Sequence, residues 1–149
     1  GVDICDDDLA ENIVISMDTS LDYSKLTKAV RVALHADQII VCNEDKLFPQ
    51  EDGLYPGCGA IASAILFCTG KEPNIVLGKP TGIMLEYVSV TYGYCYDEMV
   101  VIGDSPSSDL KMAEKYFIKS ILVGSERKNG LWVKSLKDTI SWDWNAQTL

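Results

Sequence analysis

Histidine is almost absent from this sequence, and other features that point to particular functions are missing as well. The single histidine, His35, excludes a zinc site built from several histidines, so we expect it to be an ordinary polar residue of a helix or loop. The longest apolar runs, 39–42 and 99–102, are far too short to cross a bilayer, and no basic-then-apolar signal opens the sequence. We therefore expect a soluble, cytoplasmic protein without a membrane partner.

Basic residues are also scarce. The chain has 13 Lys and Arg against 22 Asp and Glu, a net charge of −9, and no basic stripe interleaved with aromatic residues. Nucleic acid is therefore not an expected partner, because its phosphates would be repelled. Small anions remain suitable ligands where a local cation or a metal recruits them. The cysteines form no C-x-x-C pair, are odd in number and fall partly in apolar runs, so we expect reduced thiols: Cys5, Cys42, Cys58, Cys68 and Cys95.

Apolar runs alternate with amphipathic stretches along the 149 residues, of which 47% are hydrophobic and 23% charged. This rhythm is typical of a mainly parallel sheet with helices packed on it, so the predicted fold class is α/β. The predicted strands are 13–15, 38–42, 75–77, 99–102 and 120–123, and the predicted helices are 23–34, 61–67, 83–92 and 110–116.

Glycine and proline mark the predicted boundaries. Pro56-Gly57 opens a helix and Gly70 is placed to end it. The Gly78-Lys79-Pro80 sequence breaks the chain after an apolar strand and is the expected junction between two lobes, 1–77 and 78–149.

Two further segments are unusual in composition. The charge run Asp6-Asp7-Asp8 is better explained by a solvated turn or a helix cap than by a metal site. The tail, 139–149, has Trp142 and Trp144 alternating with polar residues, which favours a final strand or a docked arm.

Residues 100–110 carry the most informative pattern. An apolar strand ends in Gly103-Asp104, a short Ser/Pro loop follows, and a helix starts near Asp109. Ligands bind at the carboxyl ends of parallel strands, and two carboxylates there supply the oxygen ligands that Mg²⁺ takes. The alternative is that Asp109 stabilises a helix N-terminus and Asp104 caps a turn.

Lys79 is the second candidate. It lies between a glycine and a proline directly after an apolar strand, and a rigidly placed ammonium is a good partner for phosphate. Taken alone, such a lysine usually belongs to a surface turn.

The order of these pieces resembles a known family. The chain has a G-K-P sequence, then an amphipathic helix, an apolar strand and a G-D-x-x-x-S-D sequence. This order resembles the third and fourth motifs of haloacid dehalogenase-type phosphatases. The upstream part resembles the cap of the subgroup that contains 4-nitrophenyl, phosphoglycolate and NagD-type phosphatases. The segments that carry this resemblance are 14–18, 23–26, 42–45, 48–49 and 53–60. The resemblance covers about residues 13–123. It implies an α/β cap domain of the C2 type followed by the C-terminal half of a Rossmann-like core.

The resemblance also implies roles. Lys79 would neutralise the phosphate and stabilise an aspartyl-phosphate intermediate. Asp104 would bind Mg²⁺, and Asp109 would ligate it or hold its ligands in place. Asn43 and Asp45 would lie in the cap loop that helps to choose the substrate. The expected activity is Mg²⁺-dependent hydrolysis of small phosphorylated metabolites, and a homodimer is left open.

The sequence departs from the family in two places. The family's nucleophile motif, D-x-D-G-[TV], and the Ser/Thr motif after it do not occur, so we expect a truncated, inactive piece with an unpaired edge on the strand ending at Gly103. The loop 105–108 lacks the usual arginine, although Ser108 keeps a hydroxyl. A non-catalytic binding or regulatory module is the alternative function, and a response-regulator-like phosphoacceptor domain explains fewer of the motifs.

Overall fold

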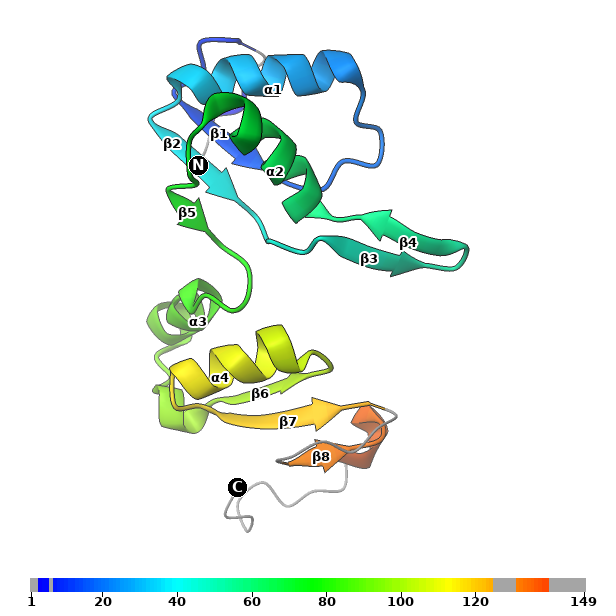
Figure 1. Cartoon of the computed structure of the whole chain (residues 1–149). Helices are drawn as coiled ribbons and strands as arrows, with labels where there is room; N and C mark the ends of the chain where they lie inside the picture. Colours follow the sequence, from blue (N-terminus) through cyan, green and yellow to red (C-terminus); the bar gives the residue numbers. More distant parts are fainter. Residues whose placement is uncertain (1–2, 6, 125–130, 140–149) are drawn as a thin grey trace. The chain divides into compact units, whose positions relative to one another are not determined.

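A computed structural model describes residues 3–5, 7–124 and 131–139 of the chain (Figure 1). The chain divides into two compact units, a first unit of Gly1–Gly78 and a second unit of Lys79–Leu149. The division follows Gly78, one residue beyond the predicted boundary. Each unit is built around its own parallel sheet. The predicted α/β class is therefore confirmed.

The sheet of the first unit contains three parallel strands in the order β1-β2-β5. These are β1 (Asn12–Ile15), β2 (Gln38–Val41) and β5 (Ile75–Val76), with Val14 paired to Ile40 and Ile40 to Ile75. Helices α1 (Tyr23–His35) and α2 (Cys58–Thr69) connect these strands and pack against each other. The core between helices and sheet consists of small and branched residues: Ile15, Ala33, Ala36, Ile39, Val41, Cys58, Ala62 and Ile65.

The helices of the first unit begin and end where the sequence predicts. The Asp22 carboxylate accepts a hydrogen bond from the Lys25 backbone N–H at 2.8 Å and caps α1. Gly57 precedes α2, and Gly70 ends it in the left-handed conformation, with φ of 64°. His35 lies exposed in the last turn of α1, and Asp8 pairs with Arg31 of the same helix at 3.5 Å.

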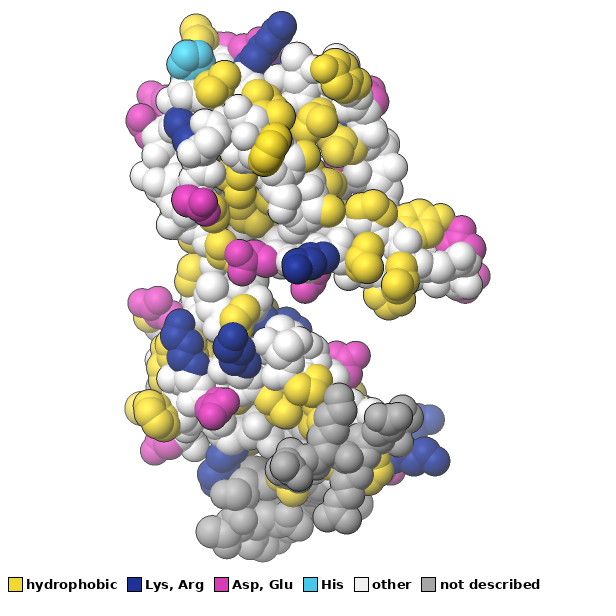
Figure 2. Space-filling view, in the orientation of Figure 1, with side chains coloured by type: hydrophobic (Ala, Val, Ile, Leu, Met, Phe, Trp, Pro, Cys, Tyr) yellow, Lys and Arg dark blue, Asp and Glu magenta, His cyan; other side chains and the backbone are white. Residues whose placement is uncertain are grey.

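A β-hairpin in the first unit was not predicted. Strands β3 (Leu47–Gln50) and β4 (Gly53–Pro56) pair antiparallel, and Figure 2 shows apolar side chains gathered on them. Leu47 is 55% exposed and Leu54 is 68% exposed. The two residues between the strands, Glu51 and Asp52, are not one of the usual hairpin-turn pairs, and Pro49 and Pro56 oppose a strand assignment.

The sheet of the second unit has the order β6-β7-β8, all parallel. Strands β6 (Val100–Gly103) and β7 (Lys119–Val123) were predicted, whereas the two-residue strand β8 (Trp132–Val133) was not. Helix α3 (Ile83–Tyr92) matches its predicted range, and a 3₁₀ turn, Tyr96–Glu98, leads from it toward β6. The core is formed by Leu85, Val101, Met112, Ala113 and Ile118.

The Ser/Pro loop expected after β6 is mostly helical instead. A π-helical turn covers Pro106–Leu110 and continues into α4 (Lys111–Lys115), so the helix begins four residues earlier than predicted. Proline suits the first turn of a helix because that position needs no backbone N–H donor. Asp109 therefore lies inside the helical segment, where its N–H donates to the Ser105 carbonyl at 2.9 Å.

Other expectations concern the chain as a whole. All five cysteines are free thiols. No helix among residues 3–5, 7–124 and 131–139 is long and apolar enough to span a bilayer. Of the tail, only Thr139 is described, at the end of the 3₁₀ helix Leu136–Thr139, so the prediction for Trp142 and Trp144 lies outside the described residues.

Candidate functional site

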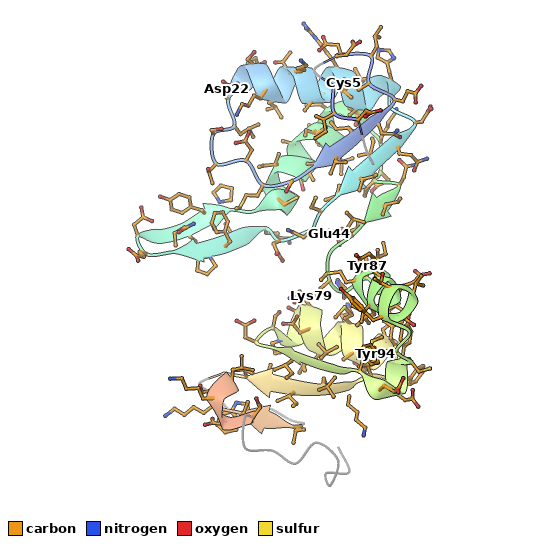
Figure 3. All side chains as sticks on the ribbon, turned by 180° about the vertical axis from the view of Figure 1, so that it is seen from behind. Cys5, Asp22, Glu44, Lys79, Tyr87 and Tyr94 are labelled. Carbon is orange, nitrogen blue, oxygen red and sulfur yellow. The ribbon has the colours of Figure 1, made fainter. Side chains whose placement is uncertain are left out.

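Lys79 and Asp109, both singled out from the sequence, form an ion pair in the second unit. The Lys79 Nζ donates a hydrogen bond to the Asp109 Oδ1 at 2.6 Å across 30 residues of chain. Figure 3 shows Lys79 beside the segment that carries α4. The Lys79 side chain is 44% exposed, so its ammonium can still receive a ligand from solvent. An ammonium has three N–H donors, and Asp109 Oδ1 takes one of them.

The Asp109 carboxylate is buried and held on several sides. Its side chain is only 5% exposed, and its Oδ2 accepts the backbone N–H of Ser105 at 3.0 Å. Gly103, the last residue of β6, lies directly against it, since a Cβ at this glycine would come within 2.2 Å of the Asp109 Cγ. The pair with Lys79 and the bond from Ser105 offset the cost of burying this charge.

Asp104 differs from Asp109 in its surroundings. It follows β6 immediately and is exposed, and within the described ranges no side-chain hydrogen bond or ion pair is made by its carboxylate. This carboxylate is therefore available to an external cation, whereas both oxygens of Asp109 already accept hydrogen bonds within the protein.

Of the two aspartates, Asp104 suits a Mg²⁺ ion better than Asp109 does. In the part of the chain that the structure describes, no three His, Cys, Asp or Glu side chains form a metal-binding group. Mg²⁺ keeps several waters and commonly binds one or two carboxylates together with substrate phosphate, so the free carboxylate of Asp104 suits it. The Asp109 oxygens can join only through their remaining lone pairs.

Asn43 and Asp45, the predicted substrate-binding residues, lie in the first unit in the segment after β2. The Asn43 Oδ1 accepts the Asp45 backbone N–H at 3.1 Å, which fixes the turn. The Asp45 carbonyl accepts the Gly59 N–H at 2.9 Å, and a Cβ on Gly57 would come within 2.2 Å of the same oxygen. The segment is therefore held against the start of α2, and Asn43 also lies against Gly78.

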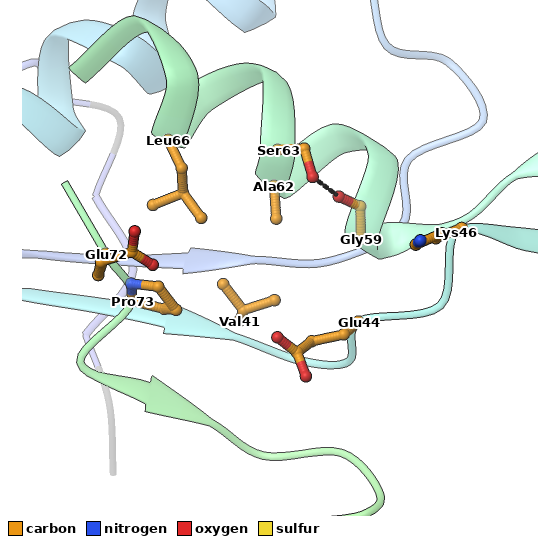
Figure 4. Close-up of a pocket in the computed structure, with 9 residues that line it drawn as sticks. All are labelled: Val41, Glu44, Lys46, Gly59, Ala62, Ser63, Leu66, Glu72 and Pro73. Carbon is orange, nitrogen blue, oxygen red and sulfur yellow. Dashed lines mark hydrogen bonds between the residues drawn. The ribbon is translucent and has the colours of Figure 1, made fainter. Parts of the chain in front are cut away.

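A pocket of about 420 Å³ lies beside this segment in the first unit (Figure 4). Glu44 lines it, together with Lys46 from the same segment and Ser63 from α2, whose hydroxyl donates to the Gly59 carbonyl at 2.7 Å. Neither Asn43 nor Asp45 is among its lining residues. The charged residues that line it, Glu44, Lys46 and Glu72, are solvent-exposed and of both signs.

A second aspartate–lysine pair, Asp18 and Lys25, lies in the first unit, and neither residue was predicted to be functional. The Lys25 Nζ contacts the Asp18 Oδ2 at 2.9 Å and the Ser20 Oγ at 2.7 Å. The hydrogen bond from Lys25, with further ones from Ser20, lowers the pKa of Asp18 from 3.8 to about 2. Both charged side chains are well exposed, so this network orders the turn before α1.

One contact in the second unit was not foreseen from the sequence. The hydroxyl oxygen of Tyr116 accepts the backbone N–H of Gly82 at 3.0 Å, although 34 residues separate them. No sequence motif marks Tyr116, because the contact depends on how α3 and the segment after α4 come together.

Comparison with known proteins connects this geometry to one family. The model of the HAD-hydrolase-like family matches residues 76–142. The sugar-phosphatase AraL of Bacillus subtilis is 35% identical over 114 residues, which are 76% of this chain and 42% of AraL. The glycerol-3-phosphate phosphatase of Rattus norvegicus is 31% identical over 112 residues, 74% of this chain and 35% of that protein.

Solved structures agree with these sequence matches. A p-nitrophenyl phosphatase from Archaeoglobus fulgidus matches with a TM-score of 0.80 and 29% identity, over 89% of this chain and 56% of that one. A 4-nitrophenylphosphatase from Thermotoga maritima matches with a TM-score of 0.77 and 27% identity, over 86% and 54%. The chain thus spans about half the length of the proteins it matches.

Proposed function

Because the chain belongs to the haloacid dehalogenase superfamily, we propose that it is part of a Mg²⁺-dependent phosphatase acting on small phosphorylated metabolites. The Lys79–Asp109 pair carries this proposal, since it places a partly exposed ammonium on a buried carboxylate in the part of the chain matched by the family model. The names of the relatives support a phosphomonoester substrate, such as a sugar phosphate or glycerol 3-phosphate.

Lys79 binds the phosphate in this proposal. Asp109 fixes the position of the ammonium, and the exposed part of the lysine side chain lets it reach a ligand oxygen. An ammonium fixed in this way stabilises negative charge on a phosphoryl group without having to reorganise during the reaction.

Asp104 holds the metal in this proposal, with Asp109 either joining it or orienting its surroundings. When bound, Mg²⁺ would neutralise charge on the transferring phosphoryl group. The exposed, unpaired Asp104 carboxylate supports this assignment. Asp109 acts mainly on Lys79, because both of its oxygens already accept hydrogen bonds.

The remaining predictions concern substrate and partners. We propose that Asn43 and Asp45 contribute to substrate choice, because hydrogen bonds fix the Asn43 side chain and the Asp45 backbone while the Asp45 carboxylate stays exposed. A cytoplasmic location remains a proposal. A homodimer is also proposed, because within the described ranges β6 pairs with β7 alone and leaves one edge open. A clean monomer by light scattering at high concentration would contradict the dimer.

The nucleophile motif of the family does not occur in these 149 residues. No D-x-D-G sequence occurs in them, so hydrolysis through an aspartyl-phosphate needs an aspartate from elsewhere. We expect little or no turnover of p-nitrophenyl phosphate by the 149 residues alone. The alternative, a non-catalytic binding module, makes the same prediction for these residues but predicts no turnover after the nucleophile is supplied.

A chimera separates the two functions. The chain is joined to the N-terminal segment of the Archaeoglobus fulgidus p-nitrophenyl phosphatase, of which it covers 56%. Hydrolysis of p-nitrophenyl phosphate that requires Mg²⁺ and is abolished by Asp104→Ala supports the phosphatase. The matched control, Asp18→Ala in the first unit, should retain activity. Full turnover by a folded Asp104→Ala chimera would contradict the metal assignment.

A further inference from the structure

Tyr116 connects the two segments that supply the Lys79–Asp109 pair. Its hydroxyl oxygen accepts the backbone N–H of Gly82, which precedes α3 and follows Lys79 by three residues. Tyr116 itself directly follows α4, the continuation of the helical segment that carries Asp109. The tyrosine therefore ties the Lys79 segment to the Asp109 segment at a second point, independent of the ion pair.

The contact is close as well as polar. Gly82 is buried, and a Cβ at this position would come within 2.2 Å of the Tyr116 Cζ. The carbonyl of Gly82 accepts the Glu86 N–H at 2.9 Å, so the same residue also forms the first turn of α3. The Tyr116 ring thus packs where a side chain would otherwise stand, and only glycine permits it.

The ring of Tyr116 is held from its other sides. It meets the Tyr96 ring edge to face, with centroids 6.0 Å apart and planes at 85°, and the Lys115 Nζ lies 5.3 Å from its centroid. Its backbone N–H donates to the Met112 carbonyl at 3.2 Å. A ring fixed in this way can orient whatever its hydroxyl binds.

From these contacts we infer that Tyr116 is a positioning residue, which holds Lys79 on Asp109 by fixing Gly82. Only Pro80 and Thr81 lie between Lys79, which carries the ammonium, and Gly82, which donates the hydrogen bond. Loss of the bond frees this segment to shift, and the ammonium then leaves the place where Asp109 holds it. The effect on phosphate rests on the proposed function, whereas the effect on the ion pair does not.

The test compares Tyr116→Phe with Tyr96→Phe in the 149-residue chain. Both changes remove one hydroxyl from the same aromatic pair, but only the first removes the bond to Gly82. NMR would follow the Lys79 Nζ–H signal, which the hydrogen bond to Asp109 protects from exchange with water, together with the hydrogen exchange of the Gly82 amide. In Tyr116→Phe both should exchange about fivefold faster, the effect of losing one net hydrogen bond. Tyr96→Phe should change neither by more than about twofold.

Orthophosphate, titrated in the presence of Mg²⁺, gives the functional readout. Tyr116→Phe should weaken phosphate binding about fivefold, Lys79→Ala should weaken it further, and Tyr96→Phe should leave it unchanged. Gly82→Ala, which displaces the ring from the other side, should reproduce the Tyr116→Phe result.

The outcomes distinguish this inference from the proposed function. An unchanged Lys79 signal in Tyr116→Phe, or an equal change in Tyr96→Phe, overturns the positioning role. A second outcome is a weakened Lys79 signal in Tyr116→Phe together with phosphate binding that is unchanged in Lys79→Ala. This outcome would confirm the positioning role of Tyr116 and refute the proposed function of Lys79.

Discussion

The Asp18–Lys25 pair of the first unit and the Asp109–Lys79 pair of the second have similar lengths, 2.9 and 2.6 Å, but different surroundings. The first joins residues seven apart, and its carboxylate side chain is 39% exposed. The second joins residues 30 apart, and its carboxylate is 5% exposed at the end of a parallel strand. Exposed local pairs contribute little to stability, so contact distance alone does not identify a functional pair.

The largest expected effect comes from Gly103, against which the Asp109 carboxylate lies. Gly103→Ala should lower the free energy of unfolding by about 2 to 3 kcal/mol, because the new Cβ overlaps a buried, hydrogen-bonded charge. Gly124, which follows the neighbouring strand β7, is the matched control, since nothing lies within 4 Å of its Cβ position. Urea denaturation measures both variants. Equal losses in the two would show that Asp109 is not tightly held.

Neutralising the aspartate of each pair should give the next largest difference in stability between the two pairs. Asp109→Asn is expected to cost about 2 kcal/mol, because it breaks a pair whose carboxylate is buried, with some relief because Lys79 is partly exposed. Asp18→Asn should leave the urea midpoint nearly unchanged. A larger midpoint shift for Asp18→Asn than for Asp109→Asn would reverse the comparison.

Substitutions at the helix ends should change the free energy of unfolding by a smaller amount, with opposite signs in the two units. Helix α2 ends at Gly70 in the left-handed conformation, whereas Phe117, just after α4, adopts φ of 56° with its side chain 94% exposed. Phe117→Gly should raise the free energy of unfolding by about 1 kcal/mol, because glycine adopts this conformation without strain. Gly70→Ala should lower it by about the same amount. Thermal denaturation tests both, and a destabilised Phe117→Gly would show that the phenylalanine ring makes a needed contact.

The smallest expected effect is a pH dependence confined to the first unit. The folded-state pKa of Asp18 is lowered to about 2, so the charged form favours folding above about pH 4, and that contribution is lost as the pH falls toward 2. NMR titration of the Asp18 carboxyl carbon should show the low pKa. Lys25→Met, which removes its main cause, should move the value back toward 3.8. An unchanged pKa in Lys25→Met would remove the lysine from this explanation.

Local signals in the sequence predict much of the fold. Helix α3 has its predicted bounds, and Gly57 and Gly70 mark the ends of α2 as predicted. The Asp22 cap of α1 was not predicted, although aspartate is a common residue at this position. The hairpin was missed because prolines oppose strand formation and because its turn residues, Glu51 and Asp52, are not one of the usual hairpin-turn pairs. Strand β8 has only two residues, too few for a periodic pattern.

The site is predictable only where motif order constrains it. Lys79 and Asp109 were selected as separate candidates, and the fold brings them together at the end of β6. The burial of Asp109, its contact with Gly103 and the hydrogen bond from the Gly82 N–H to the Tyr116 hydroxyl depend on tertiary packing, for which residue spacing carries no signal. The functional roles of all five predicted residues remain predictions: Lys79, Asp104, Asp109, Asn43 and Asp45.

A crystal structure of the chain grown with Mg²⁺ and orthophosphate tests whether Lys79 binds phosphate and Asp104 binds the metal. We expect a phosphate oxygen within hydrogen-bond distance of the Lys79 Nζ, with Lys79 still contacting Asp109 and Mg²⁺ on the Asp104 carboxylate. Phosphate bound at Lys25 instead, or Mg²⁺ bound away from Asp104 with Lys79 empty, would contradict this expectation.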